Sequence, residues 1–209
     1  MSMRVVVDNG PGRKRRASSS RSLKAAKPQV VLRAAVAADA PALLALIAAH
    51  LEEGRLLPRT LDELQVHAPR FVVAVRLGED ASARRGEEIV GCAELAPLSQ
   101  TVAEIRSLVV SAGARRFGVG IRMVEALGAT ARSVGYTRLC AFAHDPAFFV
   151  RRGFSIVPHT WVPEKIAHDC TTCPLFRNCG QYAVVMDLPY VERSSNVRRT
   201  VGERSPAHV

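Results

Sequence analysis

Two charged residues, Glu104 and Arg106, interrupt an apolar stretch over residues 103–110 that has the alternating character of a β-strand. Because side chains two residues apart on a strand point to the same face, the two charges are expected to lie side by side. Charges on a sheet face are costly unless paired or solvated, which indicates that this face lines a cleft. There Glu104 can act as a general base and Arg106 can bind a carboxylate. The alternative is that the two form only a structural ion pair.

A basic turn follows this strand directly and contains Arg115, Arg116, Gly118 and Gly120. The amphipathic helix after it begins with backbone N–H groups that lack intrahelical partners and carry the positive end of the helix dipole. Such a helix end binds phosphate oxygens, the glycines allow close approach to the backbone, and the arginines add forked donors. The sequence therefore predicts a diphosphate site, the alternative being a basic turn before a surface helix.

Arg59 lies between Pro58 and Thr60, in a constrained link between two expected helices. A guanidinium held in such a link can clamp a carboxylate, although an arginine there is more often an ordinary surface residue.

The cysteines fall into two groups. Two of them, Cys92 and Cys140, lie in expected strands and are interpreted as small buried apolar residues. The other three form a C-x2-C-x5-C cluster with His168 nearby, which is compatible with a zinc site or, in an oxidising compartment, a disulfide. The usual two-knuckle zinc pattern is absent, so reduced structural cysteines are the default for Cys170, Cys173 and Cys179.

The net charge of +10 on 209 residues comes from the two ends of the chain. Residues 1–28 hold eight Lys and Arg against one Asp, whereas residues 29–188 hold seventeen Lys and Arg against sixteen Asp and Glu. We therefore expect one folded domain over residues 29–188 between two disordered tails, 1–28 and 189–209. A transit peptide or a nucleic-acid-binding arm is the alternative for the first tail. No run of about 18 apolar residues exists, so no membrane span is expected.

The order of elements indicates an α/β (α+β) fold with a mixed, mostly antiparallel sheet of about seven strands flanked by helices. A helix is expected to begin at Asp39 and Pro41 and to stop at Gly54, and a second, short helix is expected to begin at Thr60. A third follows the basic turn, and a brief fourth covers residues 147–152. Strands are expected at residues 30–34, 71–76, 89–95, 104–110, 137–143, 154–157 and 182–188, with a loose hairpin tip at 78–88.

Several segments resemble one enzyme family. The Arg-x-x-Gly-x-Gly turn at Arg115, Gly118 and Gly120 resembles the acetyl-CoA pyrophosphate loop of the GNAT N-acetyltransferases, and the element order is that of their fold. The segment FFVRRGF at residues 148–154 is similar to their last motif. The segments GRLLPRTLDEL, AEIRSLVV and PEKIAHDCTTCPLFRNC look like those of short amino-acid N-acetyltransferases of the N-acetylglutamate synthase type.

The resemblance implies acetyl-CoA as co-substrate and assigns residues to it. The backbone N–H of Val110 is implied as the donor to the oxyanion. The acetyl-CoA-binding residues implied are Leu108, Val109, Val110, Arg115, Arg116, Phe117, Gly118, Val119, Gly120, Ile121, Phe148 and Phe149.

The resemblance also implies roles in transfer to an amine. Glu104 is the candidate base, directly or through a water, and Arg106 and Arg59 are candidates for binding the acceptor. Many relatives place a tyrosine acid in the short helix, where this chain has Phe149, which cannot donate a proton. His144 is a candidate substitute; otherwise it is an ordinary loop residue and the thiolate leaves unaided.

The function implied is transfer of the acetyl group of acetyl-CoA to the α-amine of an amino acid. L-Glutamate is the preferred acceptor, which would make the protein a cytoplasmic enzyme of the first step of arginine biosynthesis, with a homodimer as one option for its assembly. One alternative is an acetyltransferase for another small amine or for protein lysines. The other is a catalytically weak acetyl-CoA-binding module whose basic tail engages nucleic acid or a protein partner.

Overall fold

The computed structural model describes residues 29–51, 56–78 and 87–189. The two expected tails, the expected helix stop at Gly54 and most of the expected hairpin tip lie outside the described residues.

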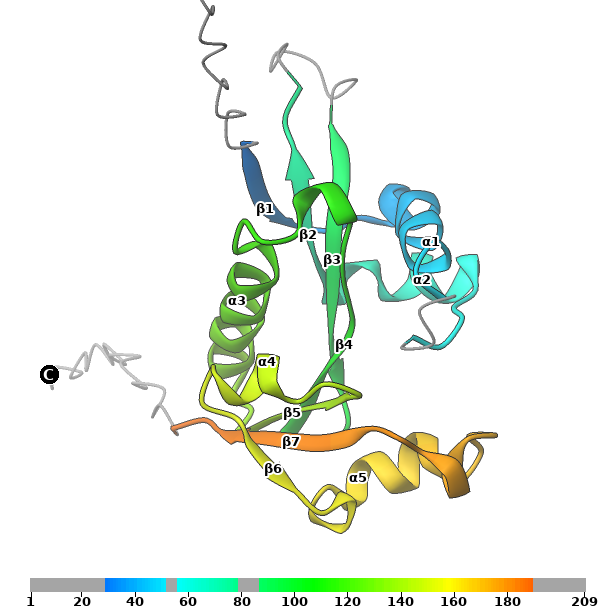
Figure 1. The fold of residues 1–209 in the computed structure, drawn as a ribbon, viewed down its shortest axis with the longest axis vertical. Helices are drawn as coiled ribbons and strands as arrows, with labels where there is room; N and C mark the ends of the chain where they lie inside the picture. Colours follow the sequence, from blue (N-terminus) through cyan, green and yellow to red (C-terminus); the bar gives the residue numbers. More distant parts are fainter. Residues whose placement is uncertain (1–28, 52–55, 79–86, 190–209) are drawn as a thin grey trace, which may run out of the picture.

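A seven-stranded sheet forms the centre of the molecule, with strand order β1-β2-β3-β4-β5-β7-β6 (Figure 1). β4 and β5 pair in parallel and the other neighbours pair antiparallel, which confirms the predicted fold class. The strands are β1 (Val30–Ala34), β2 (Phe71–Arg76), β3 (Glu88–Pro97), β4 (Val102–Val110), β5 (Arg138–Ala143), β6 (Ser155–Val157) and β7 (Tyr182–Asp187).

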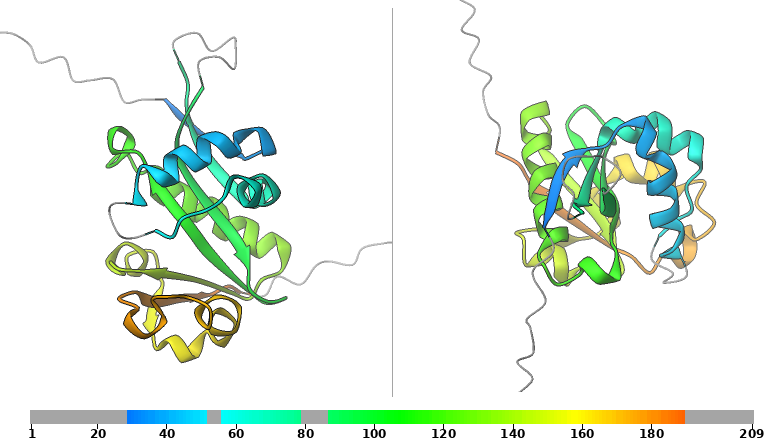
Figure 2. Two further views of the ribbon diagram at one scale, coloured as in Figure 1. Left: turned by 90° about the vertical axis from the view of Figure 1, so that its right-hand side faces the viewer. Right: turned by 90° about the horizontal axis from the view of Figure 1, so that it is seen from above.

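Helices cover both faces of this sheet, with α1 and α2 on one face and α3 on the other (Figure 2). Thr60 caps α2 as predicted, because its hydroxyl accepts a hydrogen bond from the Glu63 N–H at 3.2 Å. The helices are α1 (Ala40–Ala48), α2 (Leu61–His67), α3 (Val119–Val134), α4 (Ala147–Val150) and α5 (Pro163–Lys165), and short 3-10 turns lie at Ala37–Asp39, Ala68–Arg70, Ala112–Ala114, His159–Trp161 and Phe176–Asn178.

Two apolar clusters fill the space between the helices and the sheet. The α3 face packs Met123, Val124 and Leu127 onto β3, β4 and β5, and the α1 face packs Leu43 and Ile47 onto β2. The 3.6-residue period gives each helix one apolar face, whereas β2 is apolar on both faces and contributes Val72 to the α3 cluster and Val73 to the α1 cluster.

The two halves of the sheet diverge at β4 and β5. β4 pairs with β5 only over residues 102–105, whereas its pairing with β3 continues to Val110. The divergence begins next to an irregularity: Ser107 has φ 48°, and the β3–β4 register shifts between Cys92 and Glu94. Among the described residues, the second half of β4 therefore has a strand partner on its β3 side alone, and its edge on the β5 side is unpaired.

The connection from β6 to β7 is irregular. It contains α5 and a π-helical turn, Ile166–Cys170, and every residue from 163 to 181 is at least partly exposed. Only its neighbour Val162 is buried, against Cys140 and Val185. The segment therefore has no apolar core of its own, and it places polar side chains next to the sheet.

Candidate active site

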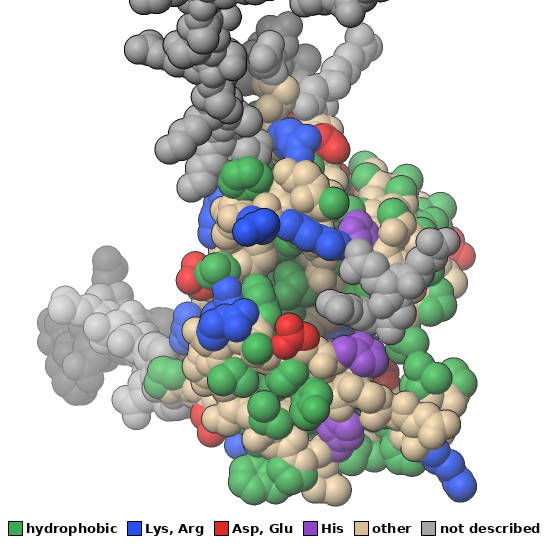
Figure 3. Space-filling model, viewed as in Figure 1, with side chains coloured by type: hydrophobic (Ala, Val, Ile, Leu, Met, Phe, Trp, Pro, Cys, Tyr) green, Lys and Arg blue, Asp and Glu red, His purple; other side chains and the backbone are tan. Residues whose placement is uncertain are grey.

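A cavity of about 280 Å³ lies where β4 ends and α3 begins. Lys and Arg side chains gather on this face, around the N-terminal end of α3 (Figure 3). The cavity contains most of the residues assigned to acetyl-CoA from the sequence and is lined by Val110, Ala114, Arg115, Arg116, Gly118, Val119, Gly120, Ile121, Phe148 and Arg152.

The two glycines of the turn have different roles. Gly118 is the N-cap of α3 and has φ 76°, a left-handed conformation that a side chain makes costly. Gly120 lies inside the first turn of α3, where an added Cβ would fall 3.6 Å from the Phe148 ring and 3.7 Å from Val110 Cγ2. Both leave the backbone N–H groups at the start of α3 accessible to an anion, so the residues fit the diphosphate of acetyl-CoA.

Arginines surround this helix end. The Arg115 Nε–H donates to the Val110 carbonyl at 2.9 Å, which ties the turn to the end of β4. Arg152 stacks on Phe148 with its guanidinium carbon 3.8 Å from the ring centroid, and burial followed by the charge of Arg151 lowers its pKa. Arg152 was not assigned to the site from the sequence. Its position beside Gly153 in the FFVRRGF segment is the sequence feature that could have indicated it.

Phe149, which was assigned to acetyl-CoA from the sequence, does not line the cavity. Its side chain is 6% exposed, packs edge-on against Phe148 and Phe154, and belongs to the core between α3 and the sheet. Phe117 points elsewhere too, since it is 42% exposed and does not line the cavity. The side chain of Val109 is buried in the α1 cluster, whereas Leu108 is partly buried and packs against the α3 cluster.

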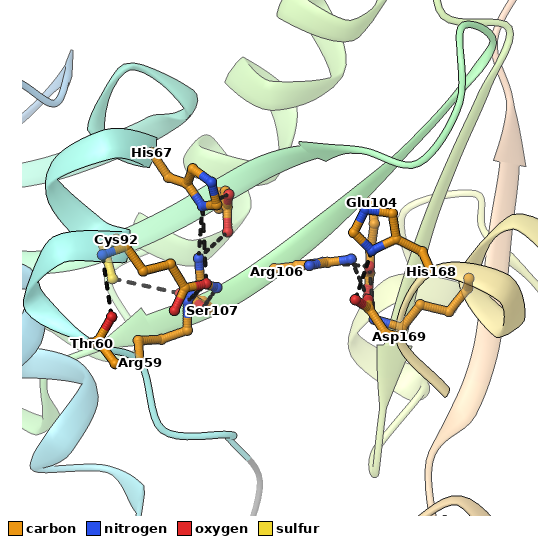
Figure 4. Close-up of polar contacts among 12 residues, drawn as sticks. Arg59, Thr60, His67, Cys92, Glu104, Arg106, Ser107, His168 and Asp169 are labelled. Atoms are coloured by element: carbon orange, nitrogen blue, oxygen red, sulfur yellow. Dashed lines mark hydrogen bonds and ion pairs between the residues drawn. The ribbon is translucent and has the colours of Figure 1, made fainter. Parts of the chain in front are cut away.

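Glu104 and Arg106 meet as the sequence predicts, and they do so within a network of four charges (Figure 4). The Arg106 Nε–H donates to Glu104 Oε2 at 2.6 Å, and its Nη2 pairs with Asp169 Oδ2. The Lys165 ammonium lies 2.9 Å from Glu104 Oε1 and 2.8 Å from Asp169 Oδ2. The ion pair between Glu104 and Arg106 is therefore present, and two residues of the β6–β7 connection extend it.

The pKa shifts in this network follow from burial and pairing. Burial alone would lower the pKa of Arg106, but the charge and hydrogen bond of Glu104 raise it above the ordinary value. Burial would raise the pKa of Asp169, but hydrogen bonds from Lys165 and His168 lower it. Glu104 itself is 3% exposed and lies between two cations, so its carboxylate is held among charged partners close to the sheet.

Arg59 is buried in a second charged cluster on the α2 side of β4 (Figure 4). Its Nη2 donates to Glu94 Oε2 at 2.8 Å, its Nε lies 2.8 Å from Glu63 Oε1, and its Nη1 donates to Ser107 Oγ at 3.2 Å. It is thus no surface residue, its side chain being 9% exposed. Glu94 is 1% exposed and was missed from the sequence, although a lone carboxylate in the apolar strand at residues 89–95 was a signal.

His144 follows β5 and is exposed, and its Nδ1 would lie 3.5 Å from a Cβ at Gly180. This places it against the connection to β7 rather than within the Glu104 network.

The cysteines have the predicted division. Cys92 and Cys140 are buried, and burial raises the pKa of Cys92 to about 12. All five cysteines are free thiols in the described part of the chain. Within residues 29–51, 56–78 and 87–189, no three His, Cys, Asp or Glu side chains are grouped to hold a metal ion, and that includes Cys170, Cys173, Cys179 and His168.

Comparison with known proteins identifies the family. Residues 44–154, which run from α1 through the cavity to the end of the FFVRRGF segment, match the model of the acetyltransferase (GNAT) family. The chain belongs to the GNAT family.

Its GNAT relatives include enzymes with named acceptors. An uncharacterised N-acetyltransferase of Chlorobaculum tepidum is 31% identical over 151 residues, which is 72% of this chain and 92% of the relative. The amino-acid acetyltransferase of Neisseria meningitidis is 31% identical over 142 residues, 67% of this chain and 30% of that enzyme. The N-acetylglutamate synthase of Neisseria gonorrhoeae, solved with coenzyme A and N-acetyl-glutamate, has a TM-score of 0.64, 28% identity, and coverage of 77% of this chain and 35% of that one.

The chain spans about a third of the length of the two Neisseria enzymes and most of the Chlorobaculum protein. The family and the cavity together establish an acetyl-CoA-dependent N-acetyltransferase of the GNAT type. In the described residues, each helix is too short or too polar to cross a membrane.

Proposed function

We propose that this GNAT enzyme acetylates the α-amine of a free amino acid and that L-glutamate is its acceptor, as in the first step of arginine biosynthesis. The observation that carries the proposal is the charged network of Glu104, Arg106, Lys165 and Asp169. Glu104 and Arg106 lie on β4, and the same strand ends at the acetyl-CoA cavity. From Arg106 to Val110 the strand spans roughly 13 Å, so one strand carries both candidate sites.

Acetyl-CoA supplies an activated acetyl thioester. The acceptor amine must lose a proton before it can react, and Glu104 is the candidate that accepts this proton, directly or through a water. Arg106 and Lys165 contact the two oxygens of the Glu104 carboxylate at 2.6 and 2.9 Å, so they hold this carboxylate in place at the site where the amine would react.

The two cations of the network indicate which chemical group the acceptor carries. A guanidinium beside a flexible ammonium suits a carboxylate, which can take forked hydrogen bonds from the first and a point charge from the second. Arg106 and Lys165 have side chains that are 20% and 14% exposed, so both are partly reachable from solvent. An amino acid can therefore place a carboxylate on these cations while its amine lies near Glu104.

Arg59 is less suited to bind the acceptor than Arg106. Two of its nitrogens are paired with Glu94 and Glu63, and the third donates to Ser107. Removing a carboxylate as buried as Glu94 from its partner costs several kcal/mol, so Arg59 supports the bulged part of β4 instead. The choice of glutamate rests on the similarity to the amino-acid acetyltransferase and N-acetylglutamate synthase of Neisseria.

The test is release of coenzyme A from acetyl-CoA by the purified full chain. The acceptors to be compared are L-glutamate, the other amino acids, several polyamines and a lysine-rich peptide. Saturable release with L-glutamate, and formation of N-acetylglutamate by mass spectrometry, is the expected result. Saturable release with polyamines or the peptide alone would contradict the proposal and assign the enzyme another amine class.

A further inference from the structure

We propose that Arg106 and Lys165 form a carboxylate-binding subsite that Asp169 occupies in the free protein. The acceptor's α-carboxylate, which is bonded to the same carbon as the reacting amine and therefore lies nearest Glu104, must displace Asp169 to bind there. The inference rests on the proposed function, since it assigns to Asp169 control over which acceptors the same site takes.

The geometry of the network points to this competition. A single oxygen of Asp169, Oδ2, contacts both Arg106 Nη2 and the Lys165 ammonium. Its other oxygen, Oδ1, lies 2.8 Å from His168 Nδ1. These are the contacts that a free carboxylate would make with a guanidinium and an ammonium, so the protein's own side chain takes the place of a ligand group.

Asp169 is the carboxylate of the network that can leave. Glu104 is fixed on β4, between β3 and β5, and its side chain is 4% exposed. Asp169 is 30% exposed and belongs to the π-helical turn Ile166–Cys170. A π-turn closes its hydrogen bond over one more residue than an α-helical turn, so a change to α-helical geometry would rotate Asp169 away from the two cations.

The segment that carries Asp169 has few other attachments to the sheet. Residues 163–181 contain no fully buried side chain, and the ion pairs of Lys165 and Asp169 link the π-turn to β4. Lys165 also lies 5.3 Å from the Phe142 ring centroid, so it can stay on the sheet when Asp169 moves. Displacement of Asp169 thus frees two donors without exposing an apolar core.

The competition has a measurable consequence. When a binding-competent state is only partly populated, the apparent affinity is reduced by that fraction. If Asp169 fills the subsite about nine-tenths of the time, Asp169→Asn should lower KM for L-glutamate roughly tenfold, with KM for acetyl-CoA unchanged. KM for 4-aminobutyrate, which is glutamate without its α-carboxylate, should stay the same. A merely structural role for Asp169 would instead raise KM or lower kcat for both acceptors.

A second variant tests the subsite with a small probe. In Asp169→Ala, sodium acetate should fill the vacated position and inhibit competitively against L-glutamate, whereas in the natural protein the same acetate concentration should not. Asp187→Asn is the matched control, because Asp187 pairs with Arg138 at 2.8 Å on β7, outside the network. Equal acetate inhibition in all three proteins, or an unchanged glutamate KM in Asp169→Asn, would overturn the proposal.

Failure of the proposed function is distinguishable from failure of this inference. If the natural protein and Asp169→Asn both turn over no amino acid, the proposed function fails. Calorimetric binding of glutarate, a dicarboxylate without an amine, then decides the inference. Tighter binding to Asp169→Asn than to the natural protein supports the subsite, and equal or weaker binding overturns it.

Discussion

The acetyl-CoA cavity and the acceptor region lie along the same strand but are built differently. The cavity is formed mainly by one continuous stretch, from Val110 to Ile121, with α4 as its second wall. The candidate acceptor region combines Glu104 and Arg106 of β4 with Lys165 and Asp169 of the β6–β7 connection, which lie 61 residues from Glu104 and 63 residues from Arg106 respectively. The first kind of site leaves a local motif in the sequence, and the second leaves isolated charges whose partners depend on the fold.

Their electrostatics differ as well. The residues that line the cavity include Arg115, Arg116 and Arg152 and no carboxylate, which suits a diphosphate that brings its own negative charge. In the candidate acceptor region, Arg106 and Lys165 each already contact the carboxylates of Glu104 and Asp169. Under the proposed function, an acceptor's carboxylate would therefore bind there by replacing a carboxylate of the protein on these cations.

The largest effect is expected at the candidate base. Glu104→Gln keeps the shape and removes the proton acceptor, so kcat should fall about 100- to 10,000-fold, while acetyl-CoA affinity changes little. Steady-state turnover and equilibrium titration with acetyl-CoA measure the two effects. Asp187→Asn, which also removes one carboxylate from an arginine, should leave both unchanged. An unaltered kcat in Glu104→Gln would remove Glu104 as the base.

A smaller effect, on acetyl-CoA affinity and not on kcat, is expected in the cavity. Gly118→Glu places a carboxylate beside the start of α3, and acetyl-CoA affinity should fall roughly 10- to 100-fold because partly screened like charges repel by about 2 kcal/mol. Gly135→Glu is the matched control, since Gly135 ends α3, has φ 103°, and has nothing within 4 Å of an added Cβ, as at Gly118. Equal losses of affinity in the two variants would show a general effect of strain in α3 and not a diphosphate site.

The smallest effect concerns stability in acid. The pKa of Asp169 lies below its ordinary 3.8, since its pairing with Lys165, His168 and Arg106 outweighs burial. Its stabilising contribution is therefore complete above pH 3.8 and is lost as the pH falls further, through the lower folded value. Asp169→Asn should be less stable than the natural protein at pH 7, and urea unfolding should show this difference shrinking below pH 3.8. A difference independent of pH would mean that the Asp169 carboxylate is not paired in solution.

The sequence predicted the framework because the framework follows from local rules. Short apolar segments bounded by polar and glycine-containing stretches located the strands, Thr60 located the start of α2, and the basic turn located α3 after it. The pairing of Glu104 with Arg106 was also accessible, since residues two apart on a strand share a face.

The remaining site residues could not be found in this way. Asp169 lies 63 residues from Arg106, so only the fold brings it to β4. It belongs to a π-helical turn, and such a turn has no periodic pattern of apolar residues by which the sequence could predict it. Glu94 was missed because a buried carboxylate can be identified only when its cationic partner is known. Its partner Arg59 is 35 residues away in the sequence. Phe148 and Phe149 could not be told apart from the sequence, because they are adjacent in one helical turn and only the fold shows that Phe148 lines the cavity while Phe149 packs edge-on against it in the core.

The central claim is that the site binds the α-carboxylate of its acceptor. The ratio of kcat/KM for L-glutamate to kcat/KM for 4-aminobutyrate tests this claim most directly. We expect the natural protein to prefer L-glutamate by roughly 30-fold or more, since losing one partner of a partly buried charge pair costs about 2–5 kcal/mol. In Arg106→Gln the ratio should collapse toward one, while Arg138→Gln, which alters an exposed pair with Asp187, should keep it. A ratio near one in the natural protein, or an unchanged ratio in Arg106→Gln, would contradict recognition of an amino acid at this site.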